Sequence, residues 1–151
     1  LIAKNFPIDD PANVRVSDCF RRYPSMVEFK RELQEFNGQH FVYVRPLGEI
    51  SDDDWVDYFQ AQLIGHSLKE LFLLVDLIGI ESNVGLDGFS RLSDLFKAQG
   101  FDRTRIAVLP PNEHYNALAK IFSIAAGSRD LDFKVELFRG KDAAKEWLGN
   151  Q

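Results

Sequence analysis

The segment from Leu71 to Phe89 constrains the fold more than any other part of the chain. It opens with an apolar run, Leu71–Val75, that suits a strand buried on both faces of a sheet. The run ends on an acid, Asp76, and a loop then leads to Gly85 at the expected start of a helix. Because function collects at the carboxyl ends of strands in open α/β sheets, this segment marks the expected working edge of the protein.

From residue 40 onward, strand and helix signals alternate along the whole chain. Short apolar runs predict strands, and apolar residues three and four apart predict helices. The expected strands are His40–Arg45, Leu71–Asp76, Arg105–Leu109 and Phe133–Phe138, and the expected helices begin near Ser51, Leu86, Asn112 and Ala143. This alternation predicts an α/β fold, in which a mixed, mostly parallel sheet of four to five strands is flanked by helices.

The composition fits a single domain and excludes several classes of partner. At 151 residues, of which 45% are hydrophobic, the chain can bury one full core, which we place in residues 25–151. Residues 1–24 hold three of the six prolines and are expected to form an irregular N-terminal extension. A formal net charge of −5 argues against nucleic acid as a partner, because phosphate binding needs a basic surface. No apolar run reaches the roughly 18–20 residues of a transmembrane helix.

The stretch just after the extension supports two interpretations. Ser25 and Glu28 match a helix capping box, and apolar residues at helical spacing continue to Phe36, so the local pattern favours a helix. The same residues also permit a strand over Val27–Phe36, with Asn37-Gly38 as the turn of a hairpin. Both interpretations remain open at this point.

The sequence contains no motif for a cofactor or a metal ion, and we predict neither. Cys19 is the only cysteine, which excludes an intrachain disulfide and fits the reducing environment of a cytoplasmic protein. The consecutive acids Asp52–Asp54 fall in the first turn of an expected helix. Their carboxylates would point in different directions, so a solvated helix start is favoured over a cation site.

Asp76 is the ionisable residue whose position most favours chemistry. A carboxylate at the end of a buried strand can accept phosphate, hold a metal ion or accept hydrogen bonds from loop amides. A phosphoacceptor would need further acids at the end of the preceding strand, and that strand ends Val44-Arg45-Pro46 without them. Bracing of the loop is therefore the favoured role of Asp76.

Three segments resemble a known family. Phe41–Ile50 is similar to an early strand followed by Gly-Glu, and Leu74–Ile80 with Gly85-Leu86 is similar to a central strand and its loop. Val135–Phe138, with Trp147-Leu148, resembles a closing strand and helix. The family is the STAS domain family, named for sulfate transporters and anti-sigma-factor antagonists, and in particular its SpoIIAA-like branch. The resemblance implies a hairpin of two early strands, which favours the strand interpretation of residues 27–36.

The resemblance also implies a binding module without enzymatic activity. Its binding surface would comprise the loop after the central strand and the start of the next helix: Asp76, Ser82, Asn83, Val84, Gly85 and Leu86. Phosphorylated members of the family carry a hydroxyl residue directly before the glycine, and here Val84 occupies that position. We therefore expect a regulatory module that binds a protein partner or a small ligand and lacks the usual phosphorylatable serine.

Two alternatives remain. Thirteen phenylalanines against four tyrosines fit either a ring-rich core or an apolar cavity, and a cavity would favour a carrier of a small apolar or lipid-like ligand. The other alternative is a phosphoacceptor or enzyme centred on Asp76. The position of any cavity relative to Asp76 would help to separate these alternatives.

Overall fold

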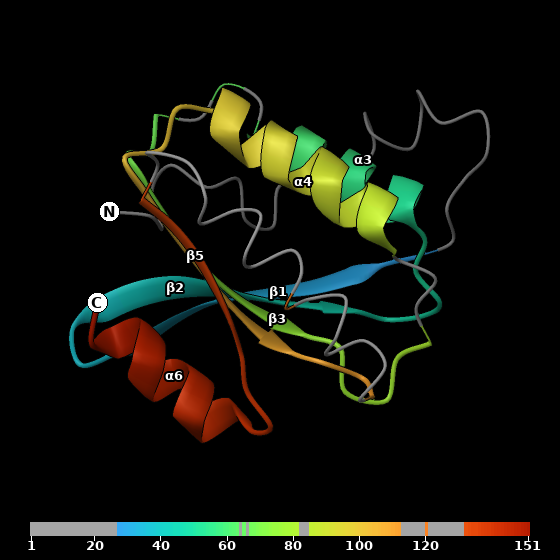
Figure 1. Ribbon diagram of the computed structural model, residues 1–151. Helices are drawn as coiled ribbons and strands as arrows, with labels where there is room; N and C mark the ends of the chain where they lie inside the picture. Colours follow the sequence, from blue (N-terminus) through green and yellow to red (C-terminus); the bar gives the residue numbers. More distant parts are fainter. Residues whose placement is uncertain (1–26, 64, 66, 82–84, 113–119, 121–131) are drawn as a thin grey trace.

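A single five-stranded sheet with helices on both faces forms the framework of the protein (Figure 1). The computed structural model describes residues 27–63, 65, 67–81, 85–112, 120 and 132–151. The elements are β1 (Phe29–Phe36), β2 (Gln39–Pro46), α3 (Asp52–Leu63), β3 (Glu70–Asp76), α4 (Leu86–Ala98), β4 (Arg103–Leu109), β5 (Asp132–Leu137) and α6 (Lys141–Gly149). The strands follow one another in sequence order across the sheet. Strand β1 is antiparallel to β2 and all other pairs are parallel, which confirms the predicted mixed, mostly parallel α/β sheet.

The helices divide between the two faces of the sheet. Helices α3 and α4 pack against each other on one face, and α6 lies on the opposite face (Figure 1). Crossovers of one hand between sequential parallel strands place their helices on the same face, which accounts for α3 and α4. Helix α6 follows the last strand, packs mainly against β4 and reaches β1. The carboxyl ends of β2 to β5 therefore share one edge of the sheet.

Burial along the strands follows their position in the sheet. In the central strand β3, every residue from Leu71 to Asp76 is buried, which explains its continuous apolar run. In β5, at one edge, Phe133 and Val135 are buried whereas Lys134 and Glu136 are exposed. This alternation is typical of a strand at the edge of a sheet.

The first described element decides between the two interpretations of residues 27–36. Strand β1 pairs with β2 over its whole length, from Phe29 opposite Pro46 to Phe36 opposite Gln39. Asn37 and Gly38 have φ angles of 52° and 80°, as a two-residue hairpin turn of this type requires. The hairpin prediction is confirmed and the helix favoured by the local pattern is wrong.

Long-range pairing explains why the helical spacing in this stretch was misleading. Arg31, which interrupts the apolar alternation of the strand, donates a hydrogen bond to the side chain of Gln62 in α3. Gln62 is buried, so Arg31 completes a polar contact inside the structure. The ring of Phe29 stacks on Tyr58 of α3, with the ring centroids 3.9 Å apart. Pairing with β2, supported by these contacts with α3, therefore outweighs the local helical spacing.

Aromatic rings fill much of the space between the sheet and the helices α3 and α4. Phe59 stacks on Trp55 and contacts Phe96 of α4 edge to face, with the centroids 5.6 and 5.3 Å apart. Phe96 in turn lies 6.1 Å from Phe133 of β5. Phenylalanine is thus prominent in the core. The buried phenylalanines among the described residues are Phe41, Phe59, Phe72, Phe89, Phe96, Phe101 and Phe133.

Two sequence predictions fall outside the described residues. These are the irregular extension over residues 1–24 and most of the helix expected after Asn112. Within the part of the chain that the structure describes, no helix is long and apolar enough to cross a membrane.

Candidate functional site

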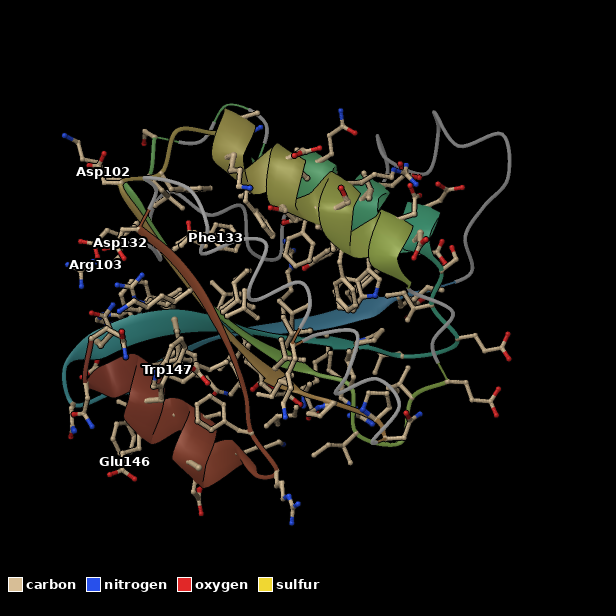
Figure 2. The ribbon with its side chains drawn as sticks, in the orientation of Figure 1. Asp102, Arg103, Asp132, Phe133, Glu146 and Trp147 are labelled. Carbon is tan, nitrogen blue, oxygen red and sulfur yellow. The ribbon has the colours of Figure 1, made fainter. Side chains whose placement is uncertain are left out.

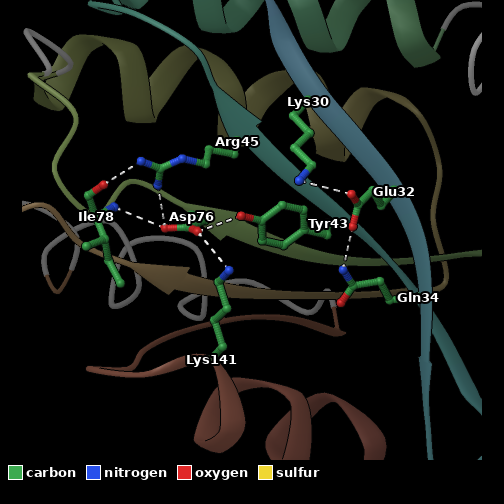
Figure 3. A network of polar contacts seen from close by, with 8 residues as sticks. All are labelled: Lys30, Glu32, Gln34, Tyr43, Arg45, Asp76, Ile78 and Lys141. Atoms are coloured by element: carbon green, nitrogen blue, oxygen red, sulfur yellow. Dashed lines mark hydrogen bonds and ion pairs between the residues drawn. The ribbon is translucent and has the colours of Figure 1, made fainter.

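Asp76 lies at the carboxyl end of β3 and is almost entirely buried, with 2% of its surface exposed. Its Oδ2 accepts a hydrogen bond of 2.6 Å from the hydroxyl of Tyr43 on β2. Its Oδ1 accepts from the guanidinium of Arg45 at 3.0 Å and from the backbone N–H of Ile78 at 3.1 Å (Figure 3). Both oxygens of this carboxylate are therefore occupied by donors.

Arg45 and Lys141 connect Asp76 to neighbouring elements. The second amino group of Arg45 donates to the carbonyl oxygen of Ile78 at 2.8 Å, so one guanidinium spans the carboxylate and its loop. Lys141, the first residue of α6, places its ammonium 3.7 Å from Oδ2 of Asp76 and 5.1 Å from the centre of the Tyr43 ring. The network thereby joins β2, β3, the loop after β3 and α6.

Tyr43 acts as a permanent proton donor within this network. Burial raises the pKa of the Tyr43 hydroxyl, and the hydrogen bond to Asp76 raises it further, because a negative charge beside the carboxylate would be unfavourable. The hydroxyl therefore stays protonated at neutral pH and keeps its hydrogen bond to Asp76. Arg45 and Lys141 offset the negative charge of the buried carboxylate.

This geometry favours a bracing role for Asp76. A phosphoacceptor has to present an accessible carboxylate oxygen to the phosphoryl donor, whereas only 4% of the Asp76 side chain is exposed. Among the described residues, no three His, Cys, Asp or Glu side chains lie close enough to hold a metal ion. The network is suited to fixing the loop after β3 against β2 and α6.

The other predicted site residues lie around the start of α4. Gly85 is the N-cap of this helix, and its N–H donates to Oδ1 of Asp52 in α3 at 3.0 Å. Leu86 is the first residue of α4. Ser82, Asn83 and Val84 lie outside the described residues. The structure thus connects Gly85 to the start of α3, while Asp76 belongs to the network with α6.

The three consecutive acids at the start of α3 each have a different partner. Asp52 accepts from Gly85, and Asp53 pairs with Arg91 of α4 at 2.8 Å. Asp54 accepts from the N–H and the hydroxyl of Ser51, and the Ser51 hydroxyl accepts from the Asp54 N–H. The side chains therefore act separately, as a capping box and as links to α4, in keeping with their predicted divergence.

Two exposed apolar residues beside Asp76 were not among the predicted site residues. Leu47 follows the end of β2 and is 56% exposed, and Ile78 follows the end of β3 and is 44% exposed. They follow the carboxyl ends of two neighbouring parallel strands, so both turns lie at the same edge of the sheet. A sequence signal was present, since each is an apolar residue within a turn, but only the pairing of β2 with β3 brings the two turns to one edge.

The two turns that carry these residues are fixed to neighbouring backbone. The N–H of Leu47 donates to the carbonyl oxygen of Glu28 at 2.7 Å. The N–H of Ile50 donates to the carbonyl oxygen of Glu81 at 3.3 Å. We call Leu47 and Ile78 the edge patch, together with the exposed acids Glu49 and Glu81 of the same turns and Glu28, which precedes β1.

Comparison with solved structures identifies the fold. A protein of the DUF3478 family from Shewanella loihica PV-4, described as uncharacterised and as having a SpoIIAA-like fold, is similar with a TM-score of 0.56. The match covers 85% of this chain and 99% of the other protein, at 14% sequence identity. The chain has a SpoIIAA-like fold. Neither the protein-family models nor the curated proteins that were compared match this sequence.

The SpoIIAA-like fold confirms the resemblance that the sequence showed at the level of architecture. At 14% identity the likeness concerns the arrangement of strands and helices alone. The function of this SpoIIAA-like chain therefore has to be inferred from its own side chains.

Proposed function

We propose that the protein is a non-enzymatic STAS-like module that binds a protein partner through the edge patch. The observation that carries this proposal is the pair Leu47 and Ile78, which are the large apolar side chains exposed within the described part of the chain. They follow the ends of two neighbouring parallel strands, at the edge where α/β folds collect function. Exposed apolar residues that gather at one place mark binding surfaces more often than residues scattered singly.

The rigidity of the turns supports binding at the edge patch. Ile78 is held on both sides, because its N–H donates to Asp76 and its carbonyl oxygen accepts from Arg45. Leu47 is held by its backbone hydrogen bond to Glu28. A surface that is already ordered loses little conformational freedom on binding, which favours affinity.

The charges around the edge patch define the chemistry of the partner. Glu28, Glu49 and Glu81 are exposed beside Leu47 and Ile78, and the whole chain carries a net charge of −5. Interfaces commonly combine an apolar centre with a polar rim of complementary charge. The partner that fits is a protein surface with an apolar centre and Lys or Arg around it.

The structure of Asp76 supports a module without catalysis. Its carboxylate is saturated by donors from Tyr43, Arg45, Ile78 and Lys141. Val84 has no hydroxyl to phosphorylate, so the proposed module would be controlled by the presence of its partner or ligand rather than by a phosphoserine.

Affinity capture with matched variants tests this proposal. The parent protein, the double variant Leu47→Arg/Ile78→Arg and the control Ala98→Arg would be used as baits in the same lysate. Ala98 is exposed at the far end of α4, so its substitution adds the same kind of charge away from the edge patch. We expect one protein to be recovered with the parent and the control and to be lost with the double variant.

Two further measurements sharpen this test. Binding of the recovered partner should weaken as salt is raised, because the acids of the edge patch contribute through exposed charges. Val84→Arg tests whether the surface extends to the predicted loop. Equal recovery of every partner with the parent and with Leu47→Arg/Ile78→Arg would refute binding through the edge patch.

A further inference from the structure

A cavity of about 240 Å³ lies at the end of the sheet opposite Asp76. It is lined by the last turn of α4, the residues after it and the first residues of β4 and β5. Asp76 is level with Leu109 at the other end of β4, so the cavity is separate from the network and from the edge patch. A ligand in this cavity would therefore bind apart from the surface of the proposed function.

The floor of the cavity is apolar, with one buried hydroxyl residue. Phe96, Phe101 and Phe133 line it, and each is at most 8% exposed. Thr104, which is 3% exposed, adds a hydroxyl group to the lining. Figure 2 shows Phe133 extending inward from β5, toward the side of the sheet that α4 covers. An apolar group of a ligand would be shielded from water at this floor.

The cavity is also lined by two charged side chains that have no ion-pair partner within the described part of the chain. Lys97 and Asp102 line it from the two sides of Gly100, and neither has an ion-pair partner among the described residues. Asp132 also lines the mouth but is already paired, with Arg105 at 2.7 Å and more distantly with Arg103. Among residues 27–112 and 132–151 as far as they are described, the cavity thus offers one cation and one anion without an ion-pair partner, beside its apolar lining.

We propose that this cavity binds a small zwitterion with an apolar body, of the chemical class of apolar α-amino acids. The α-carboxylate of the ligand would lie at Lys97, its α-ammonium at Asp102 and its side chain against the rings. The cavity has roughly eight times the volume of one water in the liquid, which fits a ligand of about ten non-hydrogen atoms. A lipid chain would not fit in this space. The ligand proposed for the cavity therefore differs from the lipid-like ligand considered from the sequence.

Three probes of equal shape separate the two charges of the ligand. They are L-leucine, 3-methylbutylamine, which lacks the carboxylate, and 4-methylpentanoate, which lacks the ammonium. Titration of the ¹⁵N-labelled protein by NMR would follow the amide signals of Thr104 and Phe133. We expect L-leucine to bind about fivefold more tightly than either single-charge probe, which is the size of effect typical of one partly exposed ion pair.

Two variants assign each charge to its residue. L-leucine should bind Lys97→Met no more tightly than 3-methylbutylamine binds the parent protein. It should bind Asp102→Asn no more tightly than 4-methylpentanoate binds the parent protein. Lys145→Met and Asp142→Asn are matched controls on α6, which lies on the other face of the sheet, and should leave the affinity unchanged. All four substitutions are outside the buried core, and the NMR spectrum of each reports directly on its folding.

Each outcome of these titrations either supports or overturns the proposal. A preference for the zwitterion that disappears in both cavity variants and persists in both controls supports the proposal. Equal binding of the three probes, or a preference that survives Lys97→Met and Asp102→Asn, overturns it. The absence of any shift at Thr104 and Phe133 up to about 10 mM probe, beyond the millimolar affinity expected of so small a ligand, also overturns it.

Discussion

Removal of the charge on Asp76 is the most informative single perturbation of this structure. Asp76→Asn keeps the shape of the side chain but replaces one acceptor oxygen with an NH₂ group. If the remaining oxygen keeps Arg45 and Ile78, the NH₂ group faces the hydroxyl of Tyr43, which then loses its acceptor 2.6 Å away. A hydrogen bond to a charged group contributes about 1.5–3 kcal/mol to stability, so this contact alone accounts for most of the expected loss.

The two cations beside Asp76 add a smaller amount. The side chains of Arg45 and Lys141 are 28% and 50% exposed, so water takes over much of their solvation when the carboxylate charge is removed. Each pair is then worth at most about 1 kcal/mol. We therefore expect Asp76→Asn to lower the free energy of unfolding by about 3 kcal/mol in total. For a chain of this size the corresponding fall in Tm is about 6–12 °C.

Urea denaturation measures this effect directly. Fluorescence of the buried Trp55 reports on the core, and an unchanged m-value would show that the variant unfolds over the same surface. Glu32→Gln is the matched control, because Glu32 also forms one ion pair and accepts one amide hydrogen bond but lies exposed on β1 (Figure 3). It should cost less than about 0.5 kcal/mol.

Combining Asp76→Asn with Tyr43→Phe tests whether the loss of stability comes from the hydrogen bond between these two side chains. Tyr43→Phe alone should cost about 1–2 kcal/mol, but far less when Asp76 is already asparagine, because both changes remove the same hydrogen bond. If Asp76→Asn proved as stable as the parent within about 0.5 kcal/mol, the carboxylate would not brace the edge and the reasoning would be refuted.

Three further predictions concern the rest of the fold. Since the pKa of Tyr43 is raised on folding, the unfolded chain loses this proton first above about pH 10, so the parent should lose stability there by up to about 1.4 kcal/mol per pH unit. Urea titrations at pH 9 to 11 should show a weaker loss in Tyr43→Phe, and parallel curves would contradict this. Gly149→Ala would place its Cβ 2.6 Å from the Phe36 ring and 2.9 Å from the Phe36 carbonyl oxygen, and should cost about 1–3 kcal/mol by thermal unfolding; a neutral result would mean that α6 moves freely on β1. Gly38→Ala forces a side chain into φ +80° and should cost about 1–2 kcal/mol, whereas Gly48→Ala, in open space, should be neutral.

The parts of the fold that were predicted correctly are those with local causes. Strand β3 was recognisable because a strand buried on both faces has to be apolar at every position from Leu71 to Val75. The start of α3 was recognisable because a Ser51 hydroxyl satisfies an N–H group within the same turn. In each case the residues that stabilise the element are neighbours in the sequence.

The parts that were predicted wrongly or missed depend on residues far apart in the sequence. The helix favoured over residues 25–36 was wrong because Phe29–Phe36 pairs with β2 along its whole length and contacts α3 through Phe29 and Arg31. The exposed residues Leu47 and Ile78 were missed because only the pairing of β2 with β3 brings the turns that carry them to the same edge of the sheet.

The sequence by itself determined the α/β class, the central strand and the acid at its end, because periodicity and caps act over a few residues. Only the tertiary structure decided what that acid does. It surrounds Asp76 with Tyr43 and Arg45 from β2 and Lys141 from α6, and it places the cavity at the other end of the sheet. The physical reason is that the donors saturating a buried charge, and the rings lining a cavity, come from separate elements whose positions are set by packing.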